Sequence, residues 1–164
     1  ISEIIGTDTD PLRQILVINK GSLDQVKMGQ TILDDKGIIG QVINVYPHSS
    51  RVMLLSDKEH AISVRIERTG VRGILFGTGD STRLSMQYVP NTADIKIGDR
   101  LISSGLGEQF PAGYPVGMVS RVQRHGSGAF AVIDIRPAAQ LQGGHHVVLL
   151  FSAPLAQEQP YAAP

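Results

Sequence analysis

The residue types of a serine hydrolase triad are present in this chain of 164 residues. His48 or His60 could act as the base. Asp57 could orient that base, and Ser103 or Ser104 could be the nucleophile, because a triad needs a base that contacts the hydroxyl and a carboxylate that holds the base. The sequence around Ser104 lacks the Asp-Ser-Gly-Gly context that prepares a nucleophile and an oxyanion hole. Turn serines and surface histidines are the alternative interpretation, so we expect no hydrolase activity.

The sequence gives little support for a metal-binding or phosphate-binding site. His145 and His146 are adjacent, so in a strand their rings would point to opposite faces and could not share one ion. The chain has no cysteine to complete such a site. The segment 77–80, Gly-Thr-Gly-Asp, lacks the lysine and the following helix of a P-loop. We therefore predict no metal site and no cofactor.

Basic side chains gather in one part of the sequence, where they could face a partner or form the solvated face of two strands. They are Arg51, Lys58, Arg65, Arg68 and Arg72. The whole chain has fifteen basic and fifteen acidic residues, and its zero formal net charge argues against nucleic acid or an anionic membrane surface as the partner. Single-stranded nucleic acid is a remote alternative, since small barrels can stack bases on aromatic side chains.

The composition indicates an all-β protein with modest cores. Hydrophobic residues make up 41% of the chain and aromatic residues only 5%, so the cores must consist mainly of Val, Ile and Leu, which favour strands. No apolar run approaches the roughly 20 residues that a membrane-spanning helix needs. The chain begins with Ile1 and not Met, and we expect a signal, an anchor or a helix to precede it.

Alternating apolar and polar residues between glycine turns predict two modules, of residues 14–79 and 80–151. The glycine-rich turn 77–80 is the predicted boundary. Residues 1–13 are predicted to be a polar lead-in, and residues 152–164 a disordered tail. The terminal strand, 146–151, could close the second module or cross back to complete the first. The predicted strands cover 15–19, 31–34, 38–45, 51–55, 62–66, 71–76, 84–89, 100–103, 116–122, 130–135 and 147–151.

An internal repeat relates the two modules, because seven residues of the first match seven of the second at one offset without a gap. The matched pairs are Ile15 with Leu84, Val17 with Met86, Val26 with Ile95, Lys27 with Lys96, Met28 with Ile97, Gly29 with Gly98 and Ile32 with Leu101. Further along, Gly40 matches Gly117, and the second copy has eight more residues between its two glycines than the first. The repeat predicts two β modules of similar topology.

Several motifs taken together resemble the MreC family of bacterial rod shape-determining proteins, from about residue 15 to residue 151. They are Val17-Ile18-Asn19-Lys20-Gly21-Ser22, Gly29-Gln30, Gly40-Gln41-Val42, Ser50-Arg51-Val52, Gly98-Asp99, Ser104-Gly105-Leu106-Gly107 and Phe110-Pro111-Ala112-Gly113-Tyr114-Pro115-Val116-Gly117. The resemblance implies two small antiparallel β-barrels of the six-stranded type in tandem. It also implies that a transmembrane helix and a coiled coil precede Ile1.

The resemblance implies a non-enzymatic scaffold of the cell-wall elongation machinery, on the periplasmic side of the inner membrane. The implied partners are the elongation-specific class B penicillin-binding transpeptidase, MreD, MreB and other copies of MreC. The alternative function is that of a chymotrypsin-like serine protease, which also has two β-barrels in tandem.

The extra residues of the second copy fall within 108–116 and include two aromatic side chains. Phe110 and Tyr114 could plug the open end of the second barrel. Alternatively, at least one of them could stay exposed and anchor a partner. Together with Arg68 and Arg72 of the basic segment, Phe110 and Tyr114 are the candidate partner-binding residues.

Overall fold

The computed structural model describes residues 1–7, 10, 12–106, 110–124 and 130–151, and the predicted tail, 152–164, lies outside these ranges. The regular secondary structure of the described part is almost entirely β, with a short 3-10 helix at Ser22–Asp24. None of its helices is long and apolar enough to cross a membrane. The strands are β1 (Ser2–Thr7), β2 (Ile15–Ile18), β3 (Thr31–Leu33), β4 (Ile38–Val45), β5 (Ser50–Leu54), β6 (Ala61–Ile66), β7 (Arg72–Gly77), β8 (Leu84–Pro90), β9 (Arg100–Ser103), β10 (Pro115–Gln123), β11 (Phe130–Pro137) and β12 (His146–Leu149).

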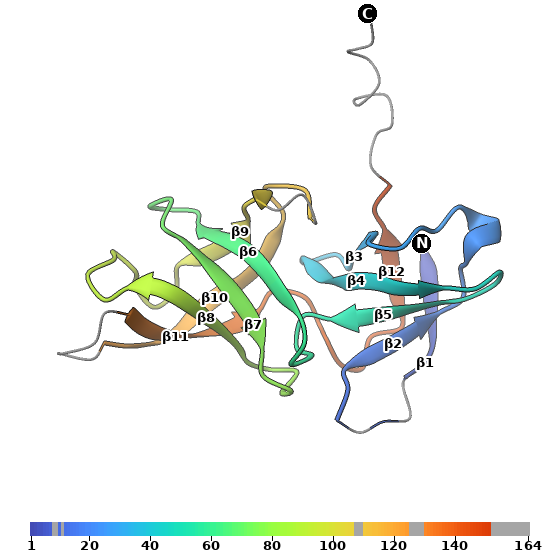
Figure 1. Ribbon diagram of the computed structural model, residues 1–164, viewed down its shortest axis with the longest axis horizontal. Coiled ribbons are helices and arrows are strands. Elements are labelled where there is room, and N and C mark those ends of the chain that lie inside the picture. The colour runs from blue at the N-terminus through green and yellow to red at the C-terminus, as the bar shows by residue number, and fades with distance from the viewer. Residues whose placement is uncertain (8–9, 11, 107–109, 125–129, 152–164) are drawn as a thin grey trace, which may run out of the picture.

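These strands close two antiparallel six-stranded barrels, which lie side by side in Figure 1. Neighbouring strands follow the order β1-β12-β3-β4-β5-β2 in the first barrel and β10-β11-β8-β7-β6-β9 in the second. The all-β class and the two tandem barrels are thus confirmed. Closure pairs both edges of every strand, which is how small β domains avoid edge-to-edge association.

The predicted boundary at residues 77–80 is wrong. β6 and β7 pair with each other, and β6 pairs with β9 while β7 pairs with β8. Residues 61–77 therefore belong to the second barrel, and the chain passes between the barrels before β6. The turn at 77–80 instead begins the connection from β7 to β8, since a short glycine-rich segment suits a hairpin as well as a linker.

The first barrel takes strands from both ends of the described chain. The prediction that residues 1–13 form a polar lead-in is wrong, because this segment contains β1. Its polar Ser2 is buried and donates to Asn19 Oδ1 at 2.8 Å. β12 pairs with β1 and β3, so the terminal strand lies in the first barrel, one of the two placements that the sequence left open. Figure 1 shows the chain returning from β11 to β12 across the two barrels.

The two barrels share one strand arrangement. β2, β3, β4 and β5 occupy the places of β8, β9, β10 and β11, while β1 and β12 occupy those of β7 and β6. The β-bulges recur as well. The register of β4 shifts once against β3 and once against β5. The register of β10 shifts at the equivalent positions against β9 and β11. The internal repeat of the sequence is therefore a repeat of topology.

The turn before β3, and its counterpart before β9, explains why the repeat is visible in the sequence. Gly29 and Gly98 have φ angles of 85° and 95°, which side chains other than glycine rarely adopt. The next residues, Gln30 and Asp99, each accept a backbone N–H of the same turn with their side-chain oxygen. Each barrel thus needs a glycine followed by a hydrogen-bond acceptor at this place.

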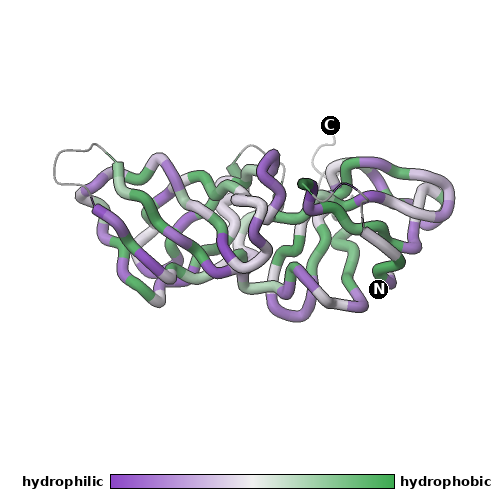
Figure 2. Tube along the Cα trace, turned by 90° about the horizontal axis from the view of Figure 1, so that it is seen from below, coloured by the Kyte–Doolittle hydropathy of each residue, from purple (hydrophilic) through white to green (hydrophobic). Residues whose placement is uncertain are grey.

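Alternation along the strands, visible as alternating colours in Figure 2, sends Val, Ile and Leu side chains inside the barrels. One hydrophobic cluster contains residues of both barrels. The segments that link the barrels are also held in place, since the Gly79 N–H donates to Ser56 O at 2.8 Å and the Gln140 N–H donates to Asp34 Oδ2 at 2.8 Å. The barrels are therefore packed against each other.

Candidate interaction surface

The residues of the predicted triad do not assemble. Ser103 is buried, and its hydroxyl donates to the carbonyl oxygen of Pro111 at 2.6 Å. The Asp57 carboxylate binds the Arg13 Nε at 3.0 Å and not a histidine. Neither ring nitrogen of His60 has a hydrogen-bond partner among the described residues. No base contacts a hydroxyl here, so these described residues cannot act as a triad.

His60 is buried in the protein interior. Its side chain is 4% exposed, and its ring centroid lies 5.6 Å from that of Phe110. Burial lowers the pKa of His60 to about 4, although the nearby Asp57 charge acts in the opposite direction. The ring is therefore neutral at pH 7, and its unpartnered nitrogens cost stability.

The remaining candidates for chemistry are not brought together either. His48 is exposed between β4 and β5, and Ser104 Oγ accepts the Leu106 N–H at 3.2 Å. Within the described ranges, no group of three or more histidine and acidic side chains could hold a metal ion. The described residues therefore assemble neither the predicted triad nor a metal site.

Phe110 and Tyr114, two of the predicted partner-binding residues, point largely into the protein. Phe110 is 5% exposed and belongs to the hydrophobic cluster, and Tyr114 packs partly buried against that cluster. Ser103 holds the loop, since its Oγ accepts the Tyr114 N–H at 3.0 Å. The burial of Phe110 favours the plug interpretation over the anchor.

Arg68, the third predicted residue, is engaged within the chain. Its Nε and Nη2 donate to the two carboxylate oxygens of Asp99 at 2.8 and 2.9 Å, and its Nη1 and Nη2 donate to Asp94. The Arg68 guanidinium holds the pKa of both carboxyl groups below their ordinary value. This bidentate clamp fastens the turn after β6 to the turn before β9. A partner would have to displace two carboxylates, so the geometry favours a structural role.

Arg72, the fourth predicted residue, is exposed on β7 directly opposite Arg65 of β6. Among the described residues, no carboxylate forms an ion pair with either guanidinium. Like charges directly opposite each other destabilise a sheet. Stability therefore does not explain this pair.

An aromatic ladder crosses the outer face of the second barrel, formed by Phe76 on β7, Tyr88 on β8 and Phe130 on β11. The ring centroids of the first pair lie 6.1 Å apart and those of the second pair 6.2 Å, both in the favoured edge-to-face arrangement. Tyr88 is 58% exposed and Phe130 52%. The chain has only four Phe and four Tyr, so the ladder places three of its eight aromatic rings outside the core.

The backbone holds Tyr88 in this ladder under strain. Between the pairs Met86 with Ile133 and Val89 with Ala131, β8 carries one residue more than β11. Tyr88 lies in this bulge with a φ angle of 65°. Such a left-handed conformation costs a residue other than glycine about 1–3 kcal/mol and is concentrated at functional sites. The exposure and the strain together indicate a binding role.

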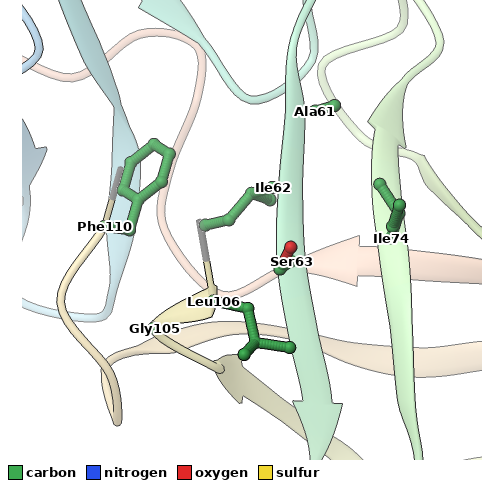
Figure 3. A pocket seen from close by; sticks show the side chains of 7 residues that line it. All are labelled: Ala61, Ile62, Ser63, Ile74, Gly105, Leu106 and Phe110. Carbon is green, nitrogen blue, oxygen red and sulfur yellow. The ribbon is translucent and has the colours of Figure 1, made fainter. Parts of the chain in front are cut away.

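A surface pocket of about 210 Å³ adjoins the ladder. Ala61 of β6 lines this pocket and lies directly opposite Phe76, which connects the two features. The volume is smaller than the roughly 300–1,000 Å³ of small-molecule sites, so the pocket suits a single side chain better than a cofactor. Figure 3 shows its lining: Ala61, Ile62, Ser63, Ile74, Gly105, Leu106 and Phe110. We call the pocket and the ladder together the aromatic face.

Comparison with known proteins gives one consistent result. The family model described as "Rod shape-determining protein MreC, barrel core" matches residues 4–151. The chain is 44% identical over 155 residues to the cell shape-determining protein MreC of Haemophilus influenzae, covering 94% of this chain and 44% of that protein. It is 40% identical over 153 residues to that of Escherichia coli, covering 93% and 42%. The chain thus spans less than half the length of these relatives.

Solved structures agree with the sequence comparison. A crystal structure of MreC from Pseudomonas aeruginosa matches with a TM-score of 0.89 and 47% identity, over 92% of this chain and 97% of that one. MreC from Helicobacter pylori, solved in a complex with the penicillin-binding protein PBP2, matches with a TM-score of 0.66 over 90% of this chain and 93% of that one. At 24% identity this second match shows the fold alone.

Proposed function

The chain belongs to the MreC family of rod shape-determining proteins, and from this premise we propose that it is a non-enzymatic scaffold of cell-wall elongation. The exposed, strained aromatic face carries the proposal. A scaffold acts by burying surface against partners, and aromatic anchors contribute most of the affinity in such interfaces. The described candidates for catalysis are, by contrast, dispersed or engaged within the fold.

The proposed main partner is the elongation-specific class B penicillin-binding transpeptidase of the same cell. The Helicobacter pylori relative, which has the same fold, was solved with a penicillin-binding protein. The size of the pocket also favours a protein partner, since the pocket suits one side chain. The aromatic rings of the ladder lie beside the pocket. Docking would hold the enzyme in an arrangement that permits synthesis.

The proposal also places the protein on the periplasmic side of the inner membrane. There it would contact MreD and MreB and associate with other copies of itself. A solved relative with 24% identity is the major periplasmic domain of a "cell shape-determining filament MreC". On the first barrel, Leu23 and Tyr46 are exposed apolar side chains in adjoining turns, joined where the Leu23 N–H donates to Pro47 O at 3.2 Å. These turns lie apart from the aromatic face and offer a separate contact for a second copy.

Two aromatic substitutions test the proposal, with binding to the periplasmic part of the transpeptidase measured by calorimetry. Phe130→Ser should weaken binding by about 1 to 4 kcal/mol with only a small fall in the melting temperature, since the ring is half exposed. Phe110→Ala should lower the free energy of unfolding by about 3 to 5 kcal/mol, because it removes a buried ring, and it also opens the pocket that Phe110 lines.

Met118→Ser is the matched control, since Met118 is an exposed apolar residue on β10, across the barrel from β7. It should change neither quantity. If the unchanged chain does not bind the transpeptidase, or if Phe130→Ser binds as well as the unchanged chain, the proposed docking through the aromatic face is wrong.

A further inference from the structure

Three successive cross-strand pairs of β6 and β7 share the outer face of the second barrel. Their inward neighbours, Ile62, Val64 and Leu75, are buried. Same-face positions on a strand are two residues apart, or about 6.6 to 6.8 Å. The outward pairs are Arg65 with Arg72, Ser63 with Ile74, and Ala61 with Phe76.

The three pairs present three different chemistries in a fixed order. The first pair offers two guanidinium groups without a counter-charge among the described residues. The second pair, Ser63 with Ile74, lines the apolar pocket of about 210 Å³. The third pair includes Phe76, the first ring of the aromatic ladder. A ligand that lies along these strands therefore meets cations, then a pocket, then an aromatic ring.

We propose that this surface binds an extended segment of the transpeptidase that carries a carboxylate and, two residues along, an apolar side chain. Same-face side chains of an extended segment recur at the same 6.6 to 6.8 Å as the pairs of β6 and β7. A carboxylate over Arg65 and Arg72 therefore places the next same-face side chain at the pocket and the following one at Phe76. The inference rests on the proposed function and adds the chemistry that the partner must present.

The arginine pair supplies the reason to expect a carboxylate. Arginine forms bidentate hydrogen bonds with carboxylates, and a partner that neutralises both groups also removes their mutual repulsion. Arg68 shows the contrast within the same barrel, since its donors already bind Asp94 and Asp99. The Arg65 and Arg72 guanidinium groups, by contrast, form no ion pair with a carboxylate of the described residues, so their donors are available to a ligand.

A second copy of this chain is the less suitable occupant. Its β1 has an exposed Glu3 and, two residues along, an exposed Ile5. However, the Glu3 carboxylate already accepts the Asn19 Nδ2–H at 3.3 Å and lies 3.9 Å from His146 Nε2. Binding to the arginine pair would require these contacts to break, so the transpeptidase remains the proposed occupant.

The test uses the whole chain and the periplasmic part of the transpeptidase as the probe. The double variant Arg65→Gln/Arg72→Gln should weaken binding by about 10- to 30-fold and reduce its salt dependence. Its melting temperature should stay the same or rise, since the like charges are gone. Ser63→Phe, which fills the pocket, should weaken binding by a similar factor at low and high salt.

Matched controls lie on the far side of the same barrel. Arg121→Gln and Ser120→Phe are substitutions at exposed positions of β10, which is across the barrel from β7. Both should leave binding within about twofold of the unchanged chain, as expected for residues outside an interface. Circular dichroism and melting of every variant separate lost binding from lost folding.

Each outcome decides between the two proposals. If the unchanged chain binds the transpeptidase and the arginine and pocket variants bind equally well, the proposed function stands and the inference is overturned. If the unchanged chain does not bind, both are overturned. If the variants lose self-association in sedimentation but keep transpeptidase binding, and Glu3→Gln reproduces that loss, the occupant is a second copy and the inference is overturned in favour of it.

Discussion

At the scale of the residue, position in the fold decides chemistry more than residue type does. His60 and Ser103 are residue types of catalysis, yet both are buried, and neither contacts a catalytic partner among the described residues. The Asp57 carboxyl is also buried, which by itself raises its pKa, but hydrogen bonds from the Gln14 and Glu59 N–H groups and from Arg13 outweigh this and lower the pKa. A hydrogen-bonded charge beside a neutral ring is a packing arrangement and not a proton relay.

His60 should make the stability of the protein depend on pH between about 6.5 and 4. Its folded-state pKa of about 4 lies below its ordinary 6.5, so in this window the unfolded chain binds more protons and stability falls as the pH falls. The full difference corresponds to roughly 3 kcal/mol. In His60→Met, whose thioether can still contact Phe110, this loss should be largely absent. Urea unfolding at a series of pH values measures it.

His48→Gln, a change at an exposed histidine, is the control for the pH experiment. It should leave the fall in stability between pH 6.5 and 4 in place. A His60→Met variant that loses as much stability over this window as the unchanged chain would show that another group is responsible.

At the scale of the element, close backbone approach fixes two glycines of the repeat. A Cβ at Gly40 of β4 would lie 2.1 Å from the carbonyl oxygen of Met53 on β5. At the equivalent Gly117 of β10, it would lie 2.5 Å from Ile135 Cγ2 and 2.7 Å from the Arg136 carbonyl oxygen, on β11. Only glycine lets these neighbouring strands come so close, which explains why both copies have glycine there.

Gly40→Ala should therefore destabilise the first barrel by about 2 kcal/mol or more, because the strand must shift to make room for the methyl group. Gly6→Ala is the matched control, since a Cβ at Gly6 of β1 meets no atom within 4 Å. It should leave the free energy of unfolding unchanged or raise it by up to about 1 kcal/mol, because alanine restricts the unfolded chain. Chemical denaturation followed by circular dichroism compares the two, and equal effects would contradict the close-approach explanation.

At the scale of the whole molecule, the first barrel closes only when the end of the described chain returns to it. β12 supplies the strand between β1 and β3, and its Val147 and Leu149 are buried in the first barrel. The second barrel is built from the continuous run β6 to β11. The two barrels thus differ in how far apart in the sequence their closing strands lie.

A chain that ends at Gln142 should lose the first barrel and keep the second. Removing two buried aliphatic side chains costs about 3 to 6 kcal/mol by itself, and the edges of β1 and β3 are left unpaired. Amide hydrogen exchange should show lost protection in β1 to β5 and retained protection in β6 to β11. A chain that ends at Phe151 is the control and should keep both barrels. Retained protection in β1 to β5 of the shorter chain would refute this dependence.

The sequence by itself determined most of the strands, the repeat and the family, because these depend on local order along the chain. The exception was β1, whose polar residues did not reveal that Ser2 is buried. Alternation of apolar residues marked strands such as 62–66, and the turn glycines Gly29 and Gly98 are required by their φ angles. The motifs combine these requirements, so the two barrels could be predicted from them. A signal of the aromatic face was present too, since Gln87 and Tyr88 interrupt the alternation of β8.

Only the tertiary structure decided which strands share a barrel and where the interaction surface lies. A hairpin and a linker have the same glycine-rich composition, so the turn at 77–80 could not reveal that β6 and β7 pair within the second barrel. The ladder of Phe76, Tyr88 and Phe130 depends on the register of three strands and on one bulge. These are long-range pairings, and a one-residue change of register would turn each side chain to the other face of the sheet.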